Sequence, residues 1–180
     1  MRTKPPGERI ATLRDGREVR IRPITPADVP LLMEFHERLS VNTTRLRFFT
    51  PLRRLSPDFA KHLCTVDYTK RCAFVVSFPG DNSIHGVGRF EAESRRSAEV
   101  AFVVEDAMQG LGIGKLLLDR LVEQARLRGY DRLTAVVLCE NDSMLTLFRE
   151  SPYHAEISME GSQAFVKMDI GARELNAAAS

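Results

Sequence analysis

A glycine-rich segment, Gln109 to Lys115, follows an apolar run and opens a long amphipathic stretch, and it constrains the fold more than any other feature. The apolar run, Val100 to Val104, predicts the end of a strand. From Gly112 to Arg128 apolar residues recur every three or four positions, which predicts a helix ending at a glycine. Leu133 to Leu138 predicts a second buried strand, parallel to the first if the helix makes a right-handed crossover.

The start of this predicted helix lacks the acidic residue that helices usually carry in their first turn. No acid occurs before Asp119, whereas Lys115 lies near the start. Free N–H groups and the helix dipole favour negative charge there, and glycines let a phosphate approach the backbone closely. We therefore expect this helix end to hold a phosphorylated cofactor.

The glycine-rich segment does not match the residue spacing of two common phosphate-binding motifs. A Walker A loop would need glycine at Gln109 and serine or threonine at Leu116. A dinucleotide-binding fingerprint beginning at Gly110 would need a third glycine at Lys115. The segment thus predicts a different kind of phosphate site.

The rest of the chain shows no internal repeat and no linker. Helices are predicted from Pro26 to about Arg38 and from Pro57 to Cys64, with a short helical or irregular piece over Arg45–Phe49 and a last helix from Asn141 to Glu150. Strands are predicted over Arg9–Leu13, Glu18–Pro23, Cys72–Phe78, Ile84–Glu93, Ala98–Val104 (apolar enough to be buried on both faces), Ala155–Met159 and Ala164–Asp169.

This order predicts one α/β domain of mixed α+β type. Its sheet is expected to be mixed and mostly antiparallel, with one central parallel β-α-β pair and helices on both faces. We place an N-terminal segment with the first strand at 1–17, the main domain at 18–170 and a flexible C-terminal tail at 171–180.

Composition excludes several classes of protein. The net charge of +2 is too small to argue for nucleic acid. The basic clusters at Arg45–Arg47, Arg53–Arg54 and Arg95–Arg96 are interpreted as a solvated basic face, with a specific site for an anionic partner as the alternative. No apolar run approaches the roughly 20 residues that span a bilayer, and Met1–Gly7 lacks a signal-peptide core. No membrane association is expected.

Cysteines and histidines suggest no metal site. The three cysteines are scattered, which suits a reducing cytoplasm, and Cys72 and Cys139 are expected in the core. The four histidines show no ligand spacing, so no metal is predicted.

Gln109-x-x-Gly112-x-Gly114, between a strand and a helix, resembles the acyl-CoA pyrophosphate loop of the GNAT acetyltransferase superfamily. Glu99–Val104, Gly129-Tyr130 and the opening Arg20–Asp28 agree with that family, and Asn141–Phe148 is similar to its later motif N-x-x-A/M-x-x-L-Y. The resemblance covers roughly residues 18 to 169. Within the family, Arg45–Phe49 and Glu140-Asn141 followed by Met144-Leu145 resemble bacterial protein-lysine acetyltransferases of the Pat type.

The resemblance implies acetyl-CoA (coenzyme A) as cofactor, lying where the two parallel strands splay apart. The strand backbone would bond the pantetheine amides, and the loop N–H groups the pyrophosphate. Gln109 would order the loop, and Asn141 would bond either the cofactor or the backbone. The implied cofactor-binding residues are Phe102, Val103, Val104, Gln109, Gly110, Leu111, Gly112, Ile113, Gly114, Lys115, Asn141, Met144 and Phe148.

Glu99 is the candidate catalytic base, since the family's base often occupies this strand. Entry into an apolar strand should raise its pKa. Alternatively, Glu99 is an ordinary strand-end charge or pairs with Arg95 or Arg96, and Glu91 and Glu93 are then the reserve bases. Phe148 departs from the family's usual tyrosine, which protonates the leaving thiolate. Tyr153 is interpreted as packing rather than as a substitute acid.

The sequence thus predicts an acyl-CoA-dependent N-acetyltransferase acting on a primary amine. A protein lysine is the first choice of acceptor and a small-molecule amine the second, with the acceptor pocket formed by the N-terminal helices and Arg45–Arg54. The rival is a non-catalytic acyl-CoA-binding sensor module. A homodimer is left open.

Overall fold

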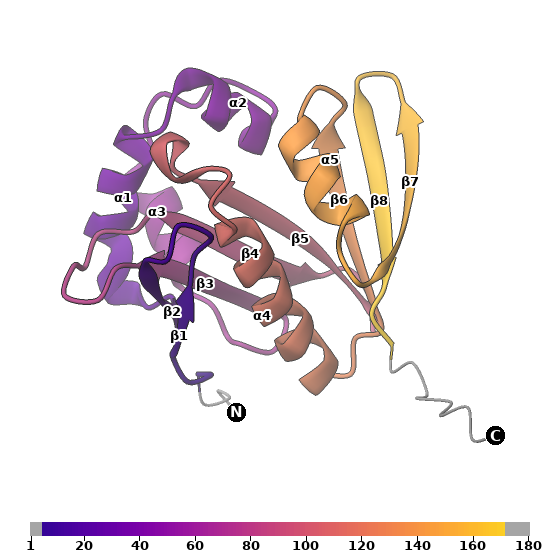
Figure 1. Ribbon diagram of the computed structural model, residues 1–180, viewed down its shortest axis with the longest axis horizontal. Helices are drawn as coiled ribbons and strands as arrows, with labels where there is room; N and C mark the ends of the chain where they lie inside the picture. The colour runs from indigo at the N-terminus through magenta and orange to yellow at the C-terminus, as the bar shows by residue number, and fades with distance from the viewer. Residues whose placement is uncertain (1–4, 172–180) are drawn as a thin grey trace.

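The computed structural model describes residues 5–171, which form one α/β domain around an eight-stranded mixed sheet (Figure 1). The spatial order of the strands is β1-β2-β3-β4-β5-β6-β8-β7, and every neighbouring pair is antiparallel except β5 and β6. This confirms the predicted central parallel pair. In chain order the elements are β1 (Arg9–Thr12), β2 (Glu18–Pro23), α1 (Val29–Glu37), α2 (Val41–Phe48), α3 (Pro57–Cys64), β3 (Arg71–Ser77), β4 (Gly86–Ala92), β5 (Ser97–Val104), α4 (Ile113–Leu127), β6 (Arg132–Leu138), α5 (Asp142–Arg149), β7 (His154–Glu160) and β8 (Gln163–Asp169).

Helices cover both faces of the sheet, as predicted. On one face α4 and α5 bury a large cluster against the strands, which includes Phe74, Phe90, Val100, Leu117 and Phe148. On the other face α1 and α3 bury a smaller cluster, which includes Leu32, Phe35, Leu63, Val75 and Val87. The two clusters lie on either side of β3, β4 and β5, so these strands occupy the middle of the molecule. The parallel pair is therefore fixed in the core through β5.

The long helix α4 lies unusually close to the sheet at Gly88 of β4. A Cβ atom at Gly88 would lie 3.0 Å from Leu117 Cβ and 3.1 Å from Phe102 Cδ1. Because such contacts are tighter than normal packing, glycine at this position lets the helix settle directly on β4 and β5. The start of α4 is thereby held beside the end of β5.

The helix predicted from Pro26 is divided into two pieces. A 3₁₀ turn over Pro26–Asp28 comes first, and α1 begins only at Val29. Pro30 has no N–H to donate to the carbonyl of Pro26, which removes an α-helical bond at this point. A capping contact precedes the 3₁₀ turn, because Thr25 N donates to Asp28 Oδ2 at 2.7 Å.

The piece expected over Arg45–Phe49 is a longer helix, α2, that begins at Val41. Ser40 is its N-cap, and Thr43 N donates to Ser40 Oγ at 3.1 Å. The residues after the cap, Val-Asn-Thr-Thr, have low helix propensity, which hid the first turn from the sequence pattern. The cap and the tertiary contacts of Thr43 override that propensity.

The ends of the chain bear on the domain boundaries. β1 pairs with β2, with Arg9 opposite Ile21, so the first strand joins the same sheet as the main domain. The predicted flexible tail, 171–180, lies outside the described residues apart from Gly171. Cys72 is in the core as predicted, whereas Cys139 is only partly buried against it.

Candidate active site

The parallel strands β5 and β6 separate part-way along their length. They pair only over Ser97–Glu99 and Arg132–Thr134, although β5 continues to Val104 and β6 to Leu138. In Figure 1 the two strands diverge toward α2 and α5. This confirms the predicted splay. It also corrects the expectation that β5 is buried on both faces, because Val103 and Val104 lie partly exposed beside the opening.

A cleft of about 590 Å³ lies along the diverging part of β5, between α2, the start of α4 and α5. Its size falls within the range of small-molecule sites. All the predicted cofactor-binding residues except Leu111 and Phe148 line it; these are Phe102, Val103, Val104, Gln109, Gly110, Gly112, Ile113, Gly114, Lys115, Asn141 and Met144. The structure therefore gathers residues of β5, the glycine segment and α5 around one space. Their role in binding stays a prediction.

The start of α4 leaves its backbone N–H groups unpaired. Its N-cap is Gly112, with φ of 97°, which offers no capping side chain, and the first turn contains no acid. Leu116 N donates to Gly112 O at 3.1 Å, and none of the N–H groups of residues 112–115 has an acceptor within residues 5–171. These free donors, aligned with the helix dipole, are suited to a negatively charged group at the cleft.

Gln109 fixes the entry to this loop. Its Nε2 donates to Val104 O at 3.1 Å and to Thr43 Oγ1 at 3.3 Å. Thr43 Oγ1 in turn donates to Asp106 Oδ1 at 2.8 Å, and Ser40 Oγ donates to the same oxygen at 2.6 Å. The loop is thus tied both to the end of β5 and to the start of α2, which agrees with the ordering role predicted for Gln109.

Asn141 caps α5 at the opposite wall of the cleft. Its Oδ1 accepts a hydrogen bond from Met144 N at 3.2 Å. Of the two roles left open for this residue, contact with the backbone is therefore the one made here. Both residues also line the cleft.

Leu111 and Phe148 are not among the residues that line the cleft. Leu111 contributes its carbonyl, which accepts a hydrogen bond from Arg14 N at 3.0 Å. Phe148 is fully buried and packs edge-on against Phe102 with 6.2 Å between ring centroids. It shares the apolar face of α5 with Leu145, three residues earlier, and this face turns toward the core. The geometry gives no support to the predicted contact of Phe148 with the cofactor.

Glu99 lies at the closed end of the splay rather than in the lining of the cleft. It is the last residue of β5 that pairs with β6, opposite Thr134. Within residues 5–171 its carboxylate has no hydrogen bond or ion pair, and Arg96 pairs with Asp131 instead. Glu99 is exposed at the surface, but the atoms packed around it desolvate its carboxylate in part. This desolvation and then the nearby carboxylate of Glu93 raise its pKa, while the guanidinium of Arg47 opposes that rise. A raised pKa is what a base acting near neutral pH requires.

The reserve bases are engaged elsewhere. Glu91 Oε1 lies 3.4 Å from Arg71 Nε, in an ion pair. Glu93 Oε2 accepts hydrogen bonds from Thr134 Oγ1 at 2.8 Å and from Ser97 Oγ at 3.2 Å. Glu99 is thus the least constrained of the three carboxylates.

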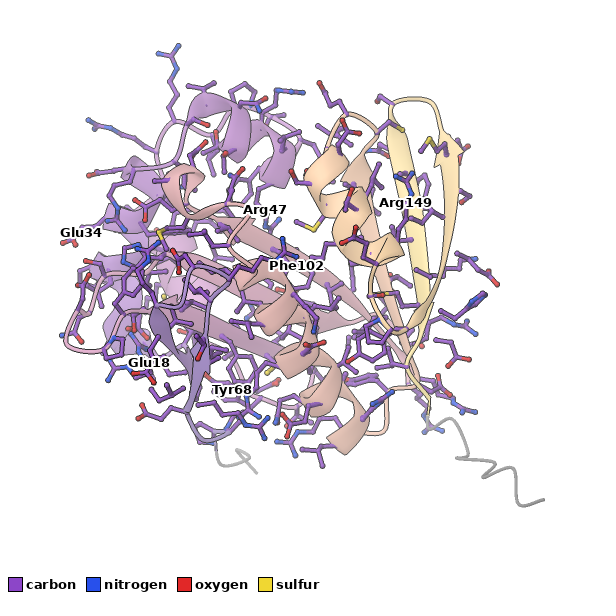
Figure 2. All side chains as sticks on the ribbon, in the orientation of Figure 1. Glu18, Glu34, Arg47, Tyr68, Phe102 and Arg149 are labelled. Atoms are coloured by element: carbon purple, nitrogen blue, oxygen red, sulfur yellow. The ribbon has the colours of Figure 1, made fainter. Side chains whose placement is uncertain are left out.

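Arg47 corrects the interpretation of Arg45–Arg47 as a solvated basic face. Arg45 lies at the surface, and its Nη1 is 2.6 Å from Glu140 Oε1. Arg47, by contrast, is half-buried and lines the cleft (Figure 2). Burial lowers its pKa, against the opposing effect of Glu99. The missed signal was the N-cap at Ser40: once α2 begins there, Thr43, Leu46 and Arg47 share one helix face, and all three line the cleft.

Arg14 is a second residue that sequence reasoning missed. It lies between β1 and β2, yet its Nη1 donates to Gly110 O at 3.3 Å and its side chain lines the cleft. Because 96 residues separate the two partners, no local sequence pattern predicts this contact. The N-terminal hairpin thus adds a positive charge to the glycine loop.

Other kinds of site find no support in the part of the chain that the structure describes. No three histidine, cysteine, aspartate or glutamate side chains gather there in a way that could hold a metal ion. None of its helices is long and apolar enough to cross a membrane.

Two curated relatives resemble the chain. Acetyltransferase PA5475 of Pseudomonas aeruginosa is 31% identical over 141 residues, covering 77% of this chain and 76% of its own. Acetyltransferase Pat of Mycolicibacterium smegmatis is 31% identical over 134 residues, covering 73% of this chain. This chain spans only 40% of that second relative's length.

A solved structure and a family model agree with these relatives. The crystal structure of the GNAT domain of S. lividans PAT superimposes with a TM-score of 0.83 at 32% identity, covering 90% of this chain and 96% of that domain. The model of the acetyltransferase (GNAT) family matches residues 37–151, which include the splayed strand, the glycine loop and α5. The chain therefore belongs to the GNAT acetyltransferase family.

Proposed function

We propose that this chain transfers an acetyl group from acetyl-CoA to a primary amine, with a protein lysine as the acceptor. Membership of the family makes acetyl-CoA the acetyl donor. The observation that carries the proposal is the uncapped start of α4, which faces a cleft opened by two splayed strands.

The residues of the cleft fit a coenzyme A molecule. The N–H groups of residues 112–115 offer donors to a diphosphate, and Lys115 and Arg14 add positive charge beside them. The free edge of β5 from Phe102 to Val104 offers backbone groups to the pantetheine amides, as an added strand would use them. When bound, acetyl-CoA supplies an activated thioester.

Glu99 is the proposed base. An ordinary lysine amine has a pKa of about 10.4, so deprotonating it at pH 7 costs about 4.6 kcal/mol. A carboxylate that accepts this proton, directly or through a water, offsets part of that cost. Glu99 suits the task because its pKa is raised and its oxygens are not bonded to other described residues.

The thiolate that leaves has no tyrosine donor at the family's usual position, which Phe148 occupies. Tyr153 Oη donates to Asp119 Oδ1 at 3.3 Å, and the guanidinium of Arg126 lies 5.4 Å from its ring centroid, so packing accounts for this residue. We infer that water protonates the thiolate. Loss of a general acid slows such a step by about 10²–10⁴-fold without preventing it.

A protein lysine is favoured as acceptor by the likeness to the Pat-type relatives. That likeness covers less than half of the longer relative, so its substrates need not be those of this chain. A small-molecule amine is the second candidate, because the expected acceptor side of the site contains only a small pocket, which lies between α2 and the sheet. A non-catalytic acyl-CoA sensor is the third.

One assay separates these functions. Purified protein is mixed with acetyl-CoA and with either lysine-containing proteins or a panel of small amines, and both free CoA and acetylated product are measured. An enzyme consumes acetyl-CoA, and Glu99→Gln lowers kcat/KM by about 10²–10⁴-fold while CoA still binds. A sensor binds CoA without turnover that depends on Glu99.

Matched variants locate the base. Glu91→Gln and Glu93→Gln remove neighbouring carboxylates that are already engaged with other side chains. Each is expected to lower kcat/KM by less than about tenfold. Full activity in Glu99→Gln together with a large loss in Glu93→Gln would move the base to Glu93 and leave the acetyltransferase function intact.

A further inference from the structure

A second, smaller pocket lies beside the cleft, between the α1–α3 layer and the sheet. It has a volume of about 30 Å³ and shares Arg47 and Val103 with the larger cleft. Its walls are mainly apolar, with Phe35, Phe48 and Leu63 among them, but two arginines also line it. These are Arg47 of α2 and Arg89 of β4.

Neither arginine is hydrogen-bonded to a carboxylate. Arg89 is 6% exposed, and its Nη2 donates to Leu63 O at 3.2 Å. Its ion pair with Glu91 is long, with 4.0 Å between Nη1 and Oε1, which is beyond hydrogen-bond distance. Arg47 has no hydrogen bond or ion pair to any described residue; its guanidinium carbon lies 4.9 Å from the Phe48 ring centroid. Burial, and then the charge of Arg47, lowers the pKa of Arg89 to about 10.

Two cations of this kind in an apolar wall call for an anion. A buried guanidinium without a bonded acid is costly, and its fork of N–H donors matches the two oxygens of a carboxylate. The small volume admits a terminal group of a few atoms, not a ring or a long chain. Because Arg47 borders both spaces, a carboxylate at this position would belong to a molecule lying in the cleft.

The proposed base lies at a suitable distance on the same side of the sheet. Arg89 is directly opposite Ala101, and Glu99 is two residues before Ala101 on β5. Side chains two residues apart point to the same face, so Arg89 and Glu99 are diagonal neighbours, about 7–8 Å apart at their Cα atoms. One face of the sheet therefore presents an anion-binding pair next to a carboxylate that accepts a proton.

We propose that the amine acceptor carries a carboxylate a few bonds from its amino group, that Arg47 and Arg89 hold this carboxylate, and that the amino group lies toward Glu99. The proposal rests on the proposed acetyltransferase function and narrows its substrate class. Two sources offer this chemistry: a free amino acid, and a peptide lysine beside an acidic residue. Polyamines and amines without an acid group would lack it.

The test compares acids with their amides. Binding to the protein with CoA present is measured by calorimetry for the twenty amino acids and their carboxamides. It is also measured for a hexapeptide with one lysine between two aspartates and for the same peptide with asparagines. Turnover with acetyl-CoA is measured for the same compounds. At least one acid is expected to bind ten times more tightly than its amide, and the amino-acid and peptide arms identify the source.

Three variants check the residues. Arg47→Met should remove the preference for the acid, raising its KM at least tenfold and leaving the KM of its amide within about twofold. Arg47→Lys, which keeps charge but not the planar fork, should be intermediate. Arg45→Met is the control, because this neighbour on α2 pairs with Glu140 outside the pocket. Arg89→Met should act like Arg47→Met, provided that its melting temperature shows a folded protein.

Each outcome decides the proposal. Equal binding of acids and amides, no binding of either, or a preference that survives in Arg47→Met overturns it. Acetylation of amines and their acids at equal rates overturns the carboxylate site but leaves the acetyltransferase function intact. Absence of turnover with every amine, with no binding of CoA, instead refutes the proposed function.

Discussion

The two ends of the cleft are built in different ways. At the donor end, the free edge of β5 and the N–H groups of residues 112–115 are backbone, and the side chains there are mostly glycine or apolar. The proposed acceptor end takes three side chains from three elements: Glu99 from β5 and Arg89 from β4, which lie beside the cleft, and Arg47 from α2, which lines it. A backbone site follows from the order of local elements, whereas a side-chain site follows from strand register and helix placement.

The start of α4 differs from the starts of α3 and α5. Ser56 caps α3, with Asp58 in its first turn, and Asn141 caps α5, followed by Asp142. Only α4 of these three begins at a glycine without an acid. A helix that begins at glycine is less stable, by roughly a few tenths of a kcal/mol, than one capped by serine or asparagine, so the retention of glycine here is consistent with a ligand that takes the place of the cap.

The largest expected effect comes from putting a negative charge at the donor end. Gly112→Asp places a carboxylate where the diphosphate is expected, so CoA affinity should fall at least about 100-fold by calorimetry. Any side chain at this φ of 97° is strained, so Gly112→Asn is the matched control, equal in shape but neutral. Equal losses in the two variants would show that strain, and not charge, weakens binding.

The proposed base at the acceptor end should affect the pH dependence of kcat/KM. With a lysine acceptor, protonation of the amine alone makes kcat/KM fall tenfold for each unit of decreasing pH. Below the raised pKa of Glu99 the base is also protonated, so the fall should steepen to about 100-fold per unit. The break should lie above the ordinary value of 4.5. In Glu99→Gln the steeper limb should disappear; its persistence would assign the base to another group.

The difference between the ends also explains what could be predicted from the sequence. The glycine segment, the missing first-turn acid and the β-α-β order are local, and they predicted the parallel pair and the uncapped helix; the splay of the strands was implied by the family resemblance. The burial of Phe148 could not be predicted, because a motif gives a position on a helix but not the face that turns toward the core. Arg47 was misplaced because the start of α2 depends on Ser40 and on the contacts of Thr43 with Asp106.

For the same physical reason, contacts between residues far apart in the chain could not be predicted from local sequence patterns. Arg14 meets Gly110, and Arg89 meets the carbonyl of Leu63, only after the sheet has formed. Glu99 could be chosen from its place on a strand, but the freedom of its carboxylate depends on where Arg96 and Glu93 find their partners. The fold, and not the spacing along the chain, decides which side chains pair with one another.

A smaller effect is expected from the charge that the N-terminal hairpin adds to the donor end. Arg14→Met removes a guanidinium that borders the glycine loop, so the KM for acetyl-CoA should rise about 3–10-fold, and less at high salt. Arg9→Met is the control, because this arginine of the same hairpin pairs with Glu123 away from the cleft. An unchanged KM, or an equal rise in both variants, would remove Arg14 from the donor end.

The smallest expected effect is on stability, and it links the acceptor end to the cost of keeping a base partly desolvated. The pKa of Glu99 is higher in the folded protein than in the unfolded chain, so the folded state binds this proton more tightly. The charged form therefore destabilises the fold as pH rises through the raised pKa, and the effect vanishes below 4.5, where both states are protonated. At pH 7.5 Glu99→Gln should melt on the order of 1 °C above the parent, and the gain should disappear near pH 4. Glu34→Gln, at an exposed glutamate, should show no such gain. A gain that does not change with pH would mean that side-chain packing, rather than the partly desolvated charge, is responsible.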